Sequence, residues 1–296
     1  MFKGSLVALV TPFDAHDRVD YAALERLIEF HVTEGSNGLV IAGTTGESAT
    51  LEKTEHVELI ARAVELVAGR LPVIAGTGSN STAQTIDLSV AVGDLGIDAY
   101  LLVVPYYNKP VQEGMFRHFS AVADAVSKPV MMYNVPGRTS SDLLPETVAR
   151  LAVHDNIFGI KEATGDIERL QQIQAVVDED FMLYSGDDFT VLPFIEQGGH
   201  GVVTVSGNVV PAAMARLCEL ASAGEHAAAK ALDDSLQPLN RCLFIESNPI
   251  PVKWALSQMG LIPPYIRLPL TEYSAPYHDE MRTALTTAGV NLENCR

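Results

Sequence analysis

Cysteine is scarce in this chain, and the few cysteines do not form a recognisable framework. The three residues, Cys218, Cys242 and Cys295, include no Cys-x-x-Cys pair. Neither a set of disulfides nor a zinc cluster is therefore predicted. This usage of cysteine is typical of a reducing compartment, and we expect a cytoplasmic protein.

Basic residues and long apolar runs are also scarce. The chain has 20 Lys and Arg against 37 Asp and Glu, which gives a net charge of −17. A surface of this sign repels nucleic acid and anionic membranes. No window approaches the run of roughly 20 apolar residues that spans a bilayer, and residues 1–12 lack the features of a signal peptide. We expect no nucleic-acid partner and no membrane partner.

What the chain does contain is an alternation of short apolar runs and longer amphipathic segments. Its 296 residues, 47% of them apolar, are enough for one large α/β core. Amphipathic segments with helical spacing include residues 21–33, 53–67, 82–95 and 112–126. The eight apolar runs predict strands at residues 6–10, 38–42, 73–75, 99–104, 130–133, 157–161, 181–185 and 201–205.

Eight alternating strand and helix units predict an α/β fold, a (β/α)8 TIM barrel with a C-terminal helical extension. A doubly wound sheet is the alternative, but it usually has a glycine-rich turn after its first strand, and Thr11-Pro12-Phe13-Asp14 follows here. We interpret residues 1–222 as the barrel and residues 223–296 as the C-terminal helical region. Further helices are predicted at residues 211–221, 226–244, 249–259 and 278–288, with a proline-rich loop at 262–265.

Two polar residues end neighbouring predicted strands, Tyr133 and Lys161. The carboxyl ends of barrel strands form the face that holds active sites. A lysine kept from water loses its proton more readily and can attack a carbonyl carbon, with a tyrosine as proton carrier. The alternative is that Lys161 pairs with Glu162 or lies at the surface. Tyr133, at the preceding strand end, favours the catalytic interpretation.

Other predicted strand ends are rich in hydroxyls and small residues. The turn at residues 43–48, Gly-Thr-Thr-Gly-Glu-Ser, suits a carboxylate or a phosphate, although the start of a capped helix explains it as well. Asp187 and Asp188 are adjacent and would point in different directions, and no His-Glu-x-x-His motif occurs. No metal site is predicted.

Several segments at these strand ends resemble the dihydrodipicolinate synthase family of pyruvate-dependent class I aldolases, which includes N-acetylneuraminate lyase. The resemblance runs from the first strand through Arg267-Leu268-Pro269, nearly the whole chain. The segments that carry it are GTTGESAT at 43–50, VIAGTG at 73–78, PYYNKP at 105–110, YNVPGRT at 133–139, GIKEATG at 159–165 and SNPIPVK at 247–253.

The resemblance implies an enzyme that condenses pyruvate with L-aspartate 4-semialdehyde to 4-hydroxy-tetrahydrodipicolinate, the first committed step of lysine and diaminopimelate biosynthesis. It implies no cofactor beyond a covalent imine of pyruvate, and a homotetramer built as a dimer of dimers. The resemblance implies that Lys161 forms the imine and that Tyr133, Thr44 and a Tyr107 from the partner subunit form a proton relay. It also implies that Thr45, Gly186 and the backbone of Val203 surround pyruvate. Arg138 is implied to bind the carboxylate of the second substrate.

Two alternatives to this function remain. Another aldolase of the same family, such as a sialic acid lyase or a 2-keto-3-deoxy sugar acid aldolase, is disfavoured by Arg138, which sialic acid lyases generally lack. A catalytically inactive homologue that senses a small acid is disfavoured because Lys161, Tyr133 and Thr44 are all present.

The resemblance also implies a candidate regulatory site. In lysine-sensitive members, L-lysine binds at the tight-dimer interface, commonly with an acid at position 84 and a histidine at position 53. Here position 84 is a neutral glutamine and position 53 a lysine, which weakens attraction for a cationic ligand. We therefore expect weak or absent lysine feedback. The matching positions are Ser48, Ala49, Lys53, His56, Asn80, Gln84 and Tyr106.

Overall fold

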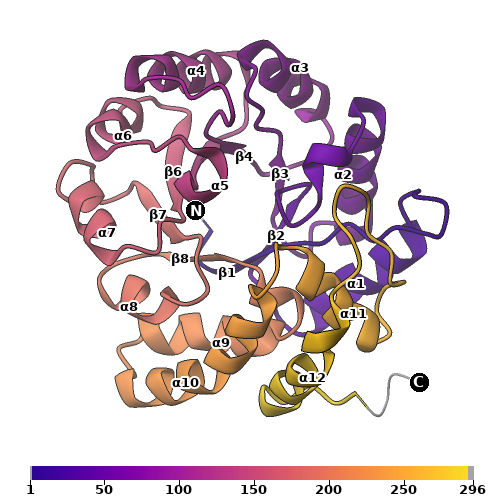
Figure 1. Cartoon of the computed structure of the whole chain (residues 1–296). Helices are drawn as coiled ribbons and strands as arrows, with labels where there is room; N and C mark the ends of the chain where they lie inside the picture. The colour runs from indigo at the N-terminus through magenta and orange to yellow at the C-terminus, as the bar shows by residue number, and fades with distance from the viewer. Residues whose placement is uncertain (1, 293–296) are drawn as a thin grey trace.

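The computed structural model describes residues 2–292 and contains a closed barrel of eight parallel strands. Each strand pairs with the next, and β8 pairs with β1, so no edge is left open (Figure 1). The predicted (β/α)8 barrel is confirmed, and the doubly wound sheet is excluded. The strands are β1 (Gly4–Ala8), β2 (Gly38–Ile41), β3 (Val73–Gly76), β4 (Ala99–Val103), β5 (Val130–Asn134), β6 (Ile157–Glu162), β7 (Met182–Ser185) and β8 (Gly201–Thr204).

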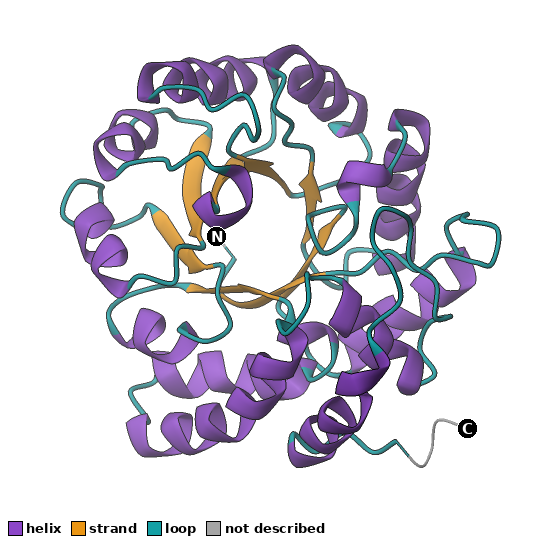
Figure 2. Ribbon diagram, viewed as in Figure 1, coloured by secondary structure: helices purple, strands orange, loops and turns teal. Residues whose placement is uncertain are grey.

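Helices surround these strands on the outside (Figure 2). Several begin at local signals: Asp20 and Ser81 accept hydrogen bonds from the first turns of α1 and α3, and Pro145 and Pro211 open α6 and α9. The barrel helices are α1 (Tyr21–Thr33), α2 (Lys53–Val67), α3 (Thr82–Val92), α4 (Gln112–Ala125), α5 (Pro136–Thr139), α6 (Pro145–Ala152), α7 (Ile167–Gln174), α8 (Val191–Glu196) and α9 (Pro211–Ser222), with short 3-10 turns at Ser48–Thr50 and Ser206–Asn208.

Three further helices follow the barrel and lie together at one side of it (Figure 1). They are α10 (His226–Leu243), α11 (Ile250–Gln258) and α12 (His278–Thr287), with a 3-10 turn at Ala275–Tyr277. Helix α10 packs against both α9 and α12, and Trp254 of α11 stacks on His278 with ring centroids 4.4 Å apart. Within residues 2–292, no helix has the length and apolar character needed to cross a bilayer.

The apolar core has two layers. The larger layer lies between the strands and the helices, and the smaller one fills the barrel itself. At the amino end of the barrel, the Tyr184 hydroxyl donates to the carbonyl of Phe2 at 2.5 Å. Phe2 and Phe158 meet edge to face there, with centroids 6.0 Å apart. Aromatic side chains thus close the amino end of the barrel, and active sites of this fold lie at the opposite, carboxyl end.

Candidate active site

Lys161 and Tyr133 face each other inside the carboxyl end of the barrel. They are paired positions on β6 and β5, and Lys161 Nζ lies 4.1 Å from the centroid of the Tyr133 ring. Both residues are 6% exposed. Glu162 does not pair with Lys161; its carboxylate accepts from Asn134 Nδ2 and from the N–H of Thr164. The alternative in which Lys161 forms an ion pair with its neighbour is therefore wrong.

Gly186 lies directly beside Lys161, and Val203 lies inside the same barrel. A Cβ atom at Gly186 would lie 2.8 Å from Lys161 Cε and 2.6 Å from the side chain of Ala163, so only glycine leaves room for the lysine. Val203 belongs to the same apolar cluster inside the barrel as Tyr133. The lysine amine is thus enclosed by an aromatic face, a glycine and apolar side chains.

The turn after β2 offers hydrogen-bond donors at the same end of the barrel. Its N–H groups at Gly46 and Glu47 donate back to Gly43 and Thr44. Within residues 2–292, no oxygen of the chain accepts from the N–H groups of Thr44 and Thr45. Thr45 Oγ1 accepts from Asn248 Nδ2 at 2.9 Å. Two backbone donors and one hydroxyl are therefore available to an anion such as a carboxylate.

A cavity of about 740 Å³ opens beside this turn. On the barrel side it is lined by Thr44, Val103, Val135 and Arg138. Arg138 belongs to α5, the short helix that lies over the barrel opening in Figure 1, and its Nη2 donates to the carbonyl of Asn248 at 3.3 Å. The guanidinium is therefore held at the rim of the cavity, where it is exposed to an incoming anion.

The same cavity extends to most of the predicted regulatory positions. It is lined by Ser48, Ala49, Lys53, His56, Gln84 and Tyr106. Burial lowers the pKa of His56 from its ordinary value of 6.5, and His56 Nε2 lies 2.8 Å from the carbonyl oxygen of Gly76. A buried, neutral imidazole is the consequence.

Two predicted residues lie apart from these clusters. Tyr107 is 88% exposed, has a positive φ of 74° and does not line the cavity. Asn80 is also outside the cavity lining, and its carbonyl accepts from Asn108 Nδ2 at 2.8 Å.

Sequence analysis missed three residues that hold the site. Asn248 bonds both Thr45 and Arg138, Asp87 forms an ion pair with Lys53, and Lys253 forms a buried ion pair with Glu47 in the turn after β2. Asn248 and Lys253 fall within the segment at residues 247–253 that carried the family resemblance, and that was the only signal available. Nothing in the sequence distinguishes Asp87 from other helical acids.

The fold and the site together define a class of protein, a (β/α)8-barrel enzyme with its polar groups at the carboxyl ends of the strands. Within residues 2–292, no group of three His, Cys, Asp or Glu residues is placed to hold a metal ion. The side chains gathered at this face are a lysine, a tyrosine, two threonines and an arginine.

Comparison with known proteins identifies the family. The model of the dihydrodipicolinate synthetase family matches residues 1–288, and the chain belongs to that family. It is 56% identical over 290 residues to the 4-hydroxy-tetrahydrodipicolinate synthase of Pseudomonas aeruginosa, which covers 98% of this chain and 99% of that protein. The family resemblance that the sequence motifs indicated is confirmed.

Two solved structures extend the likeness to three dimensions. The dihydrodipicolinate synthase of Acinetobacter baumannii, crystallised with pyruvate, superposes with a TM-score of 0.96 at 46% identity and covers 98% of this chain and 100% of that one. A monomeric dihydrodipicolinate synthase variant superposes with a TM-score of 0.96 at 39% identity, covering 98% of each chain.

Proposed function

We propose that this chain condenses pyruvate with L-aspartate 4-semialdehyde to give 4-hydroxy-tetrahydrodipicolinate, the first committed step of lysine and diaminopimelate biosynthesis. The observation that supports this most directly is Lys161 Nζ, buried 4.1 Å from the Tyr133 ring centroid. Curated relatives with this activity match the chain over nearly its whole length.

The reaction begins at Lys161. In its unprotonated form, the amine attacks the keto carbon of pyruvate, the carbonyl oxygen leaves as water, and an imine joins Nζ to that carbon. Loss of a methyl proton gives an enamine, whose carbon attacks the aldehyde of the second substrate. The amino group of that substrate then displaces Nζ from the imine carbon and closes the ring, so one water is released overall. The chemistry needs no cofactor besides the lysine imine.

Binding of the two carboxylates falls to different parts of the cavity. Thr45 and the free N–H groups of Thr44 and Thr45 hold the pyruvate carboxylate, while Gly186 and Val203 line the pyruvate end. Arg138 forks onto the carboxylate of the semialdehyde, which its planar guanidinium matches in geometry. This role of Arg138 favours the semialdehyde over the sugar acids used by sialic acid lyases.

Proton transfer is the role of Tyr133. For a tyrosine hydroxyl to carry protons in catalysis, other groups must supply protons to it and remove them. The proposed relay runs from Tyr133 through Thr44 to the Tyr107 that a partner subunit contributes. Each subunit's own Tyr107 would then serve the site of its partner. The exposure of Tyr107, of Val111 (75%) and of Tyr106 (36%) supports an interface between copies here.

The assembly we propose is a homotetramer made of two such dimers, in the cytoplasm. Because a monomeric variant occurs among the similar structures, the assembly is to be measured directly, by sedimentation equilibrium.

Borohydride reduction in the presence of pyruvate tests the function. We expect the protein to lose activity and to gain one pyruvate-derived group on the peptide that contains Lys161. The Lys161→Ala variant is the control and should gain none. A label on Lys253 or Lys109 in place of Lys161, or no label, would contradict the imine assignment.

A further inference from the structure

Side chains along β6 do not alternate regularly between the inside and the outside of the barrel. Phe158 belongs to the apolar cluster inside the barrel and Ile160 to the cluster outside it. Lys161, only three residues after Phe158, again faces inward onto Tyr133. Since side chains alternate along a regular strand, two inward residues at this spacing require one extra residue between them.

The pairing of β5 with β6 contains that extra residue. Val130 pairs with Ile157, but Met131 pairs with Gly159, so the register shifts by one residue at the start of the two strands. Without this bulge, the alternation that begins at Phe158 would turn Ile160 inward and Lys161 outward toward the helices. The orientation of the lysine therefore depends on which register the upper part of β6 adopts.

A side-chain hydrogen bond joins the two strands immediately beyond Tyr133 and Lys161. Asn134 and Glu162 are the next paired positions, and Asn134 Nδ2 donates to Glu162 Oε2 at 3.0 Å. The N–H of Ala163 donates to the Asn134 carbonyl at 2.9 Å. The register is thus held by side chains as well as backbone at the level of the reactive pair.

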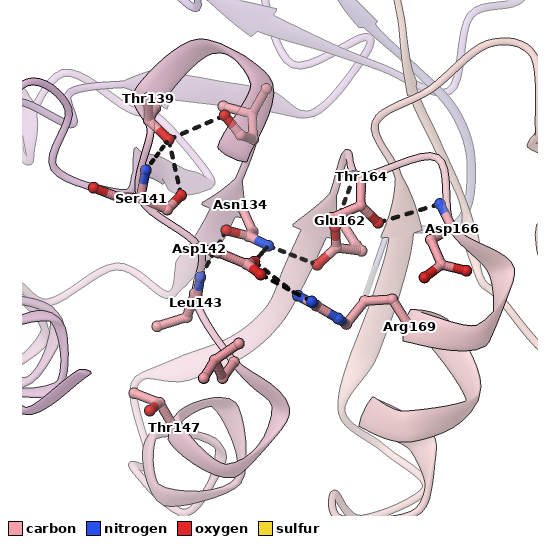
Figure 3. A network of polar contacts seen from close by, with 12 residues as sticks. Asn134, Thr139, Ser141, Asp142, Leu143, Thr147, Glu162, Thr164, Asp166 and Arg169 are labelled. Atoms are coloured by element: carbon pink, nitrogen blue, oxygen red, sulfur yellow. Dashed lines mark hydrogen bonds and ion pairs between the residues drawn. The ribbon is translucent and has the colours of Figure 1, made fainter. Parts of the chain in front are cut away.

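The side-chain amide of Asn134 donates both of its hydrogens, and its oxygen accepts one hydrogen bond (Figure 3). Its Nδ2 also donates to Asp142 Oδ1 at 2.9 Å, and its Oδ1 accepts from the N–H of Leu143 at 2.9 Å. Carboxylates accept and a backbone N–H only donates, so the amide has one possible orientation. Asn134 is fully buried and Glu162 is 3% exposed, which makes loss of any of these bonds costly.

Two further contacts anchor this network to the surrounding structure. Arg169 of α7 donates to both carboxylate oxygens of Asp142, at 2.8 and 2.9 Å. Glu162 Oε1 accepts from the N–H of Thr164 at 2.8 Å. The network therefore ties the ends of β5 and β6 to the chain that follows each strand.

We propose that Asn134 and Glu162 are positioning residues, whose side-chain hydrogen bond fixes the register of β5 and β6 above the bulge and thereby holds Lys161 against Tyr133. The inference rests on the proposed function, in which Lys161 forms an imine with pyruvate. Neither residue touches the substrate, because both project from the strands away from Lys161.

The test makes the same substitution at two places: at Asn134, which ends β5 opposite Glu162, and at Asn156, which directly precedes β6. Asn134→Asp keeps the shape of the side chain but removes both donated hydrogen bonds. Asn156→Asp is the matched control, because Asn156 Nδ2 also donates two hydrogen bonds, to the carbonyls of Ala123 and Val126, at the amino end of the strand. The readouts are the rate of imine formation with pyruvate, trapped by borohydride and weighed by mass spectrometry, and circular dichroism for the fold.

We expect Asn134→Asp to slow imine formation about tenfold or more while the protein stays folded, and Asn156→Asp to stay within about twofold of the unmodified protein. The double variant Asn134→Asp/Glu162→Gln restores one hydrogen bond in reverse, from the Gln amide to the Asp carboxylate. It should regain part of the lost rate.

The proposal is overturned if folded Asn134→Asp forms the imine at the unmodified rate, or if Asn156→Asp is slowed to the same extent. Should Asn134→Asp fail to fold, Glu162→Gln replaces it. The Gln side chain has one acceptor oxygen for two donors, Asn134 and Thr164, and an unchanged rate in that variant would equally overturn the proposal. Failure of the unmodified protein to form an imine would instead contradict the proposed function.

Discussion

Lys253 of α11 and Glu47 of the turn after β2 form an ion pair that is almost completely buried, with side chains 4% and 1% exposed. The N–H of Arg267 donates to the second oxygen of Glu47 at 3.2 Å. The C-terminal helices thereby hold the turn that carries Thr44 and Thr45. Burial lowers the pKa of Lys253, and the nearby carboxylate opposes this shift.

Breaking this pair should destabilise the protein strongly. Lys253→Met leaves the buried Glu47 carboxylate without its cationic partner, and we expect a loss of about 3–5 kcal/mol in the free energy of unfolding, measured in urea. The double variant Lys253→Met/Glu47→Leu should recover most of it. Lys230→Met, which breaks the exposed pair with Asp234, is the control and should change stability by less than about 1 kcal/mol. If Lys253→Met and Lys230→Met lowered the stability equally, burial of the Lys253–Glu47 pair would not be the cause of the loss.

Arg138 should determine the affinity for the second substrate. We expect Arg138→Leu to raise the KM for L-aspartate 4-semialdehyde roughly thirtyfold, equivalent to about 2 kcal/mol for a charge-assisted contact, and to change the KM for pyruvate much less. Arg138→Lys keeps the charge but not the planar fork, so it should be intermediate. Steady-state kinetics with each substrate varied in turn provide the measurement. A parallel rise in both KM values would indicate a structural role for Arg138.

Tyr107 should act in a neighbouring subunit. Tyr107→Phe should lower kcat by weakening the proton relay, while borohydride trapping of the pyruvate imine persists. Mixing Tyr107→Phe with Lys161→Ala should restore part of the activity, because one hybrid site then contains an intact lysine and an intact tyrosine. Mass spectrometry of the intact assembly confirms subunit exchange. If exchange occurs and activity does not return, the site is not shared.

The sequence predicted the barrel because each strand is a separate apolar run and amphipathic helical segments lie between the first strands. Helices α1 and α2 were predicted with the bounds that they have. The first strand was predicted at residues 6–10 but spans Gly4–Ala8, since the apolar run continues past the paired residues. Their positions at the ends of two consecutive apolar runs also predicted that Tyr133 and Lys161 lie together.

Contacts between distant segments could not be predicted in the same way. The bulge in β6 lies in a continuously apolar run, Ile157-Phe158-Gly159-Ile160, where no alternation reveals a shift in register. The bond from Asn248 to Thr45 joins residues 203 positions apart. Such pairs are set by how the C-terminal helices pack on the barrel, and a local pattern has no information on that packing.

Buried histidines should make stability depend on pH. Burial lowers the pKa of His31 from 6.5 to about 3. The folded state therefore keeps this imidazole neutral, whereas the unfolded chain binds a proton below pH 6.5. The contribution of His31 to the free energy of unfolding is therefore fully present above pH 6.5, and it is lost progressively as the pH drops toward the folded pKa. This one group should remove about 2 kcal/mol between pH 7 and pH 5.

The His31→Gln variant isolates this contribution. At pH 7 this variant should be less stable than the unmodified protein, because the Gln amide is buried in a space shaped for an imidazole. Its stability should nevertheless fall less between pH 7 and pH 5. Urea unfolding at one fixed protein concentration provides the free energies. Equal losses in the two proteins over this pH range would show that His31 does not contribute to the acid sensitivity.

Feedback by L-lysine should be weak or absent. The structure adds one acidic group near the predicted ligand positions, because Asp87 lines the cavity and pairs with Lys53. Because of this pairing, Lys53 is not an isolated positive charge. The two side chains are 51% and 62% exposed, so the ion pair itself is weak. The expectation therefore depends on Gln84, which brings no carboxylate to the ligand's ammonium groups.

Inhibition curves with L-lysine should separate the contributions of these groups. Gln84→Glu adds a carboxylate, and a charge interaction of about 1 kcal/mol after screening corresponds to a several-fold gain in affinity. Gln84→Ala is the matched control and should bring no gain, and Asp87→Asn should not strengthen inhibition in the Gln84→Glu background. Tight inhibition of the unmodified protein at micromolar L-lysine would show that Tyr106, His56 and Asp87 suffice for binding, and that the missing carboxylate at position 84 does not decide it.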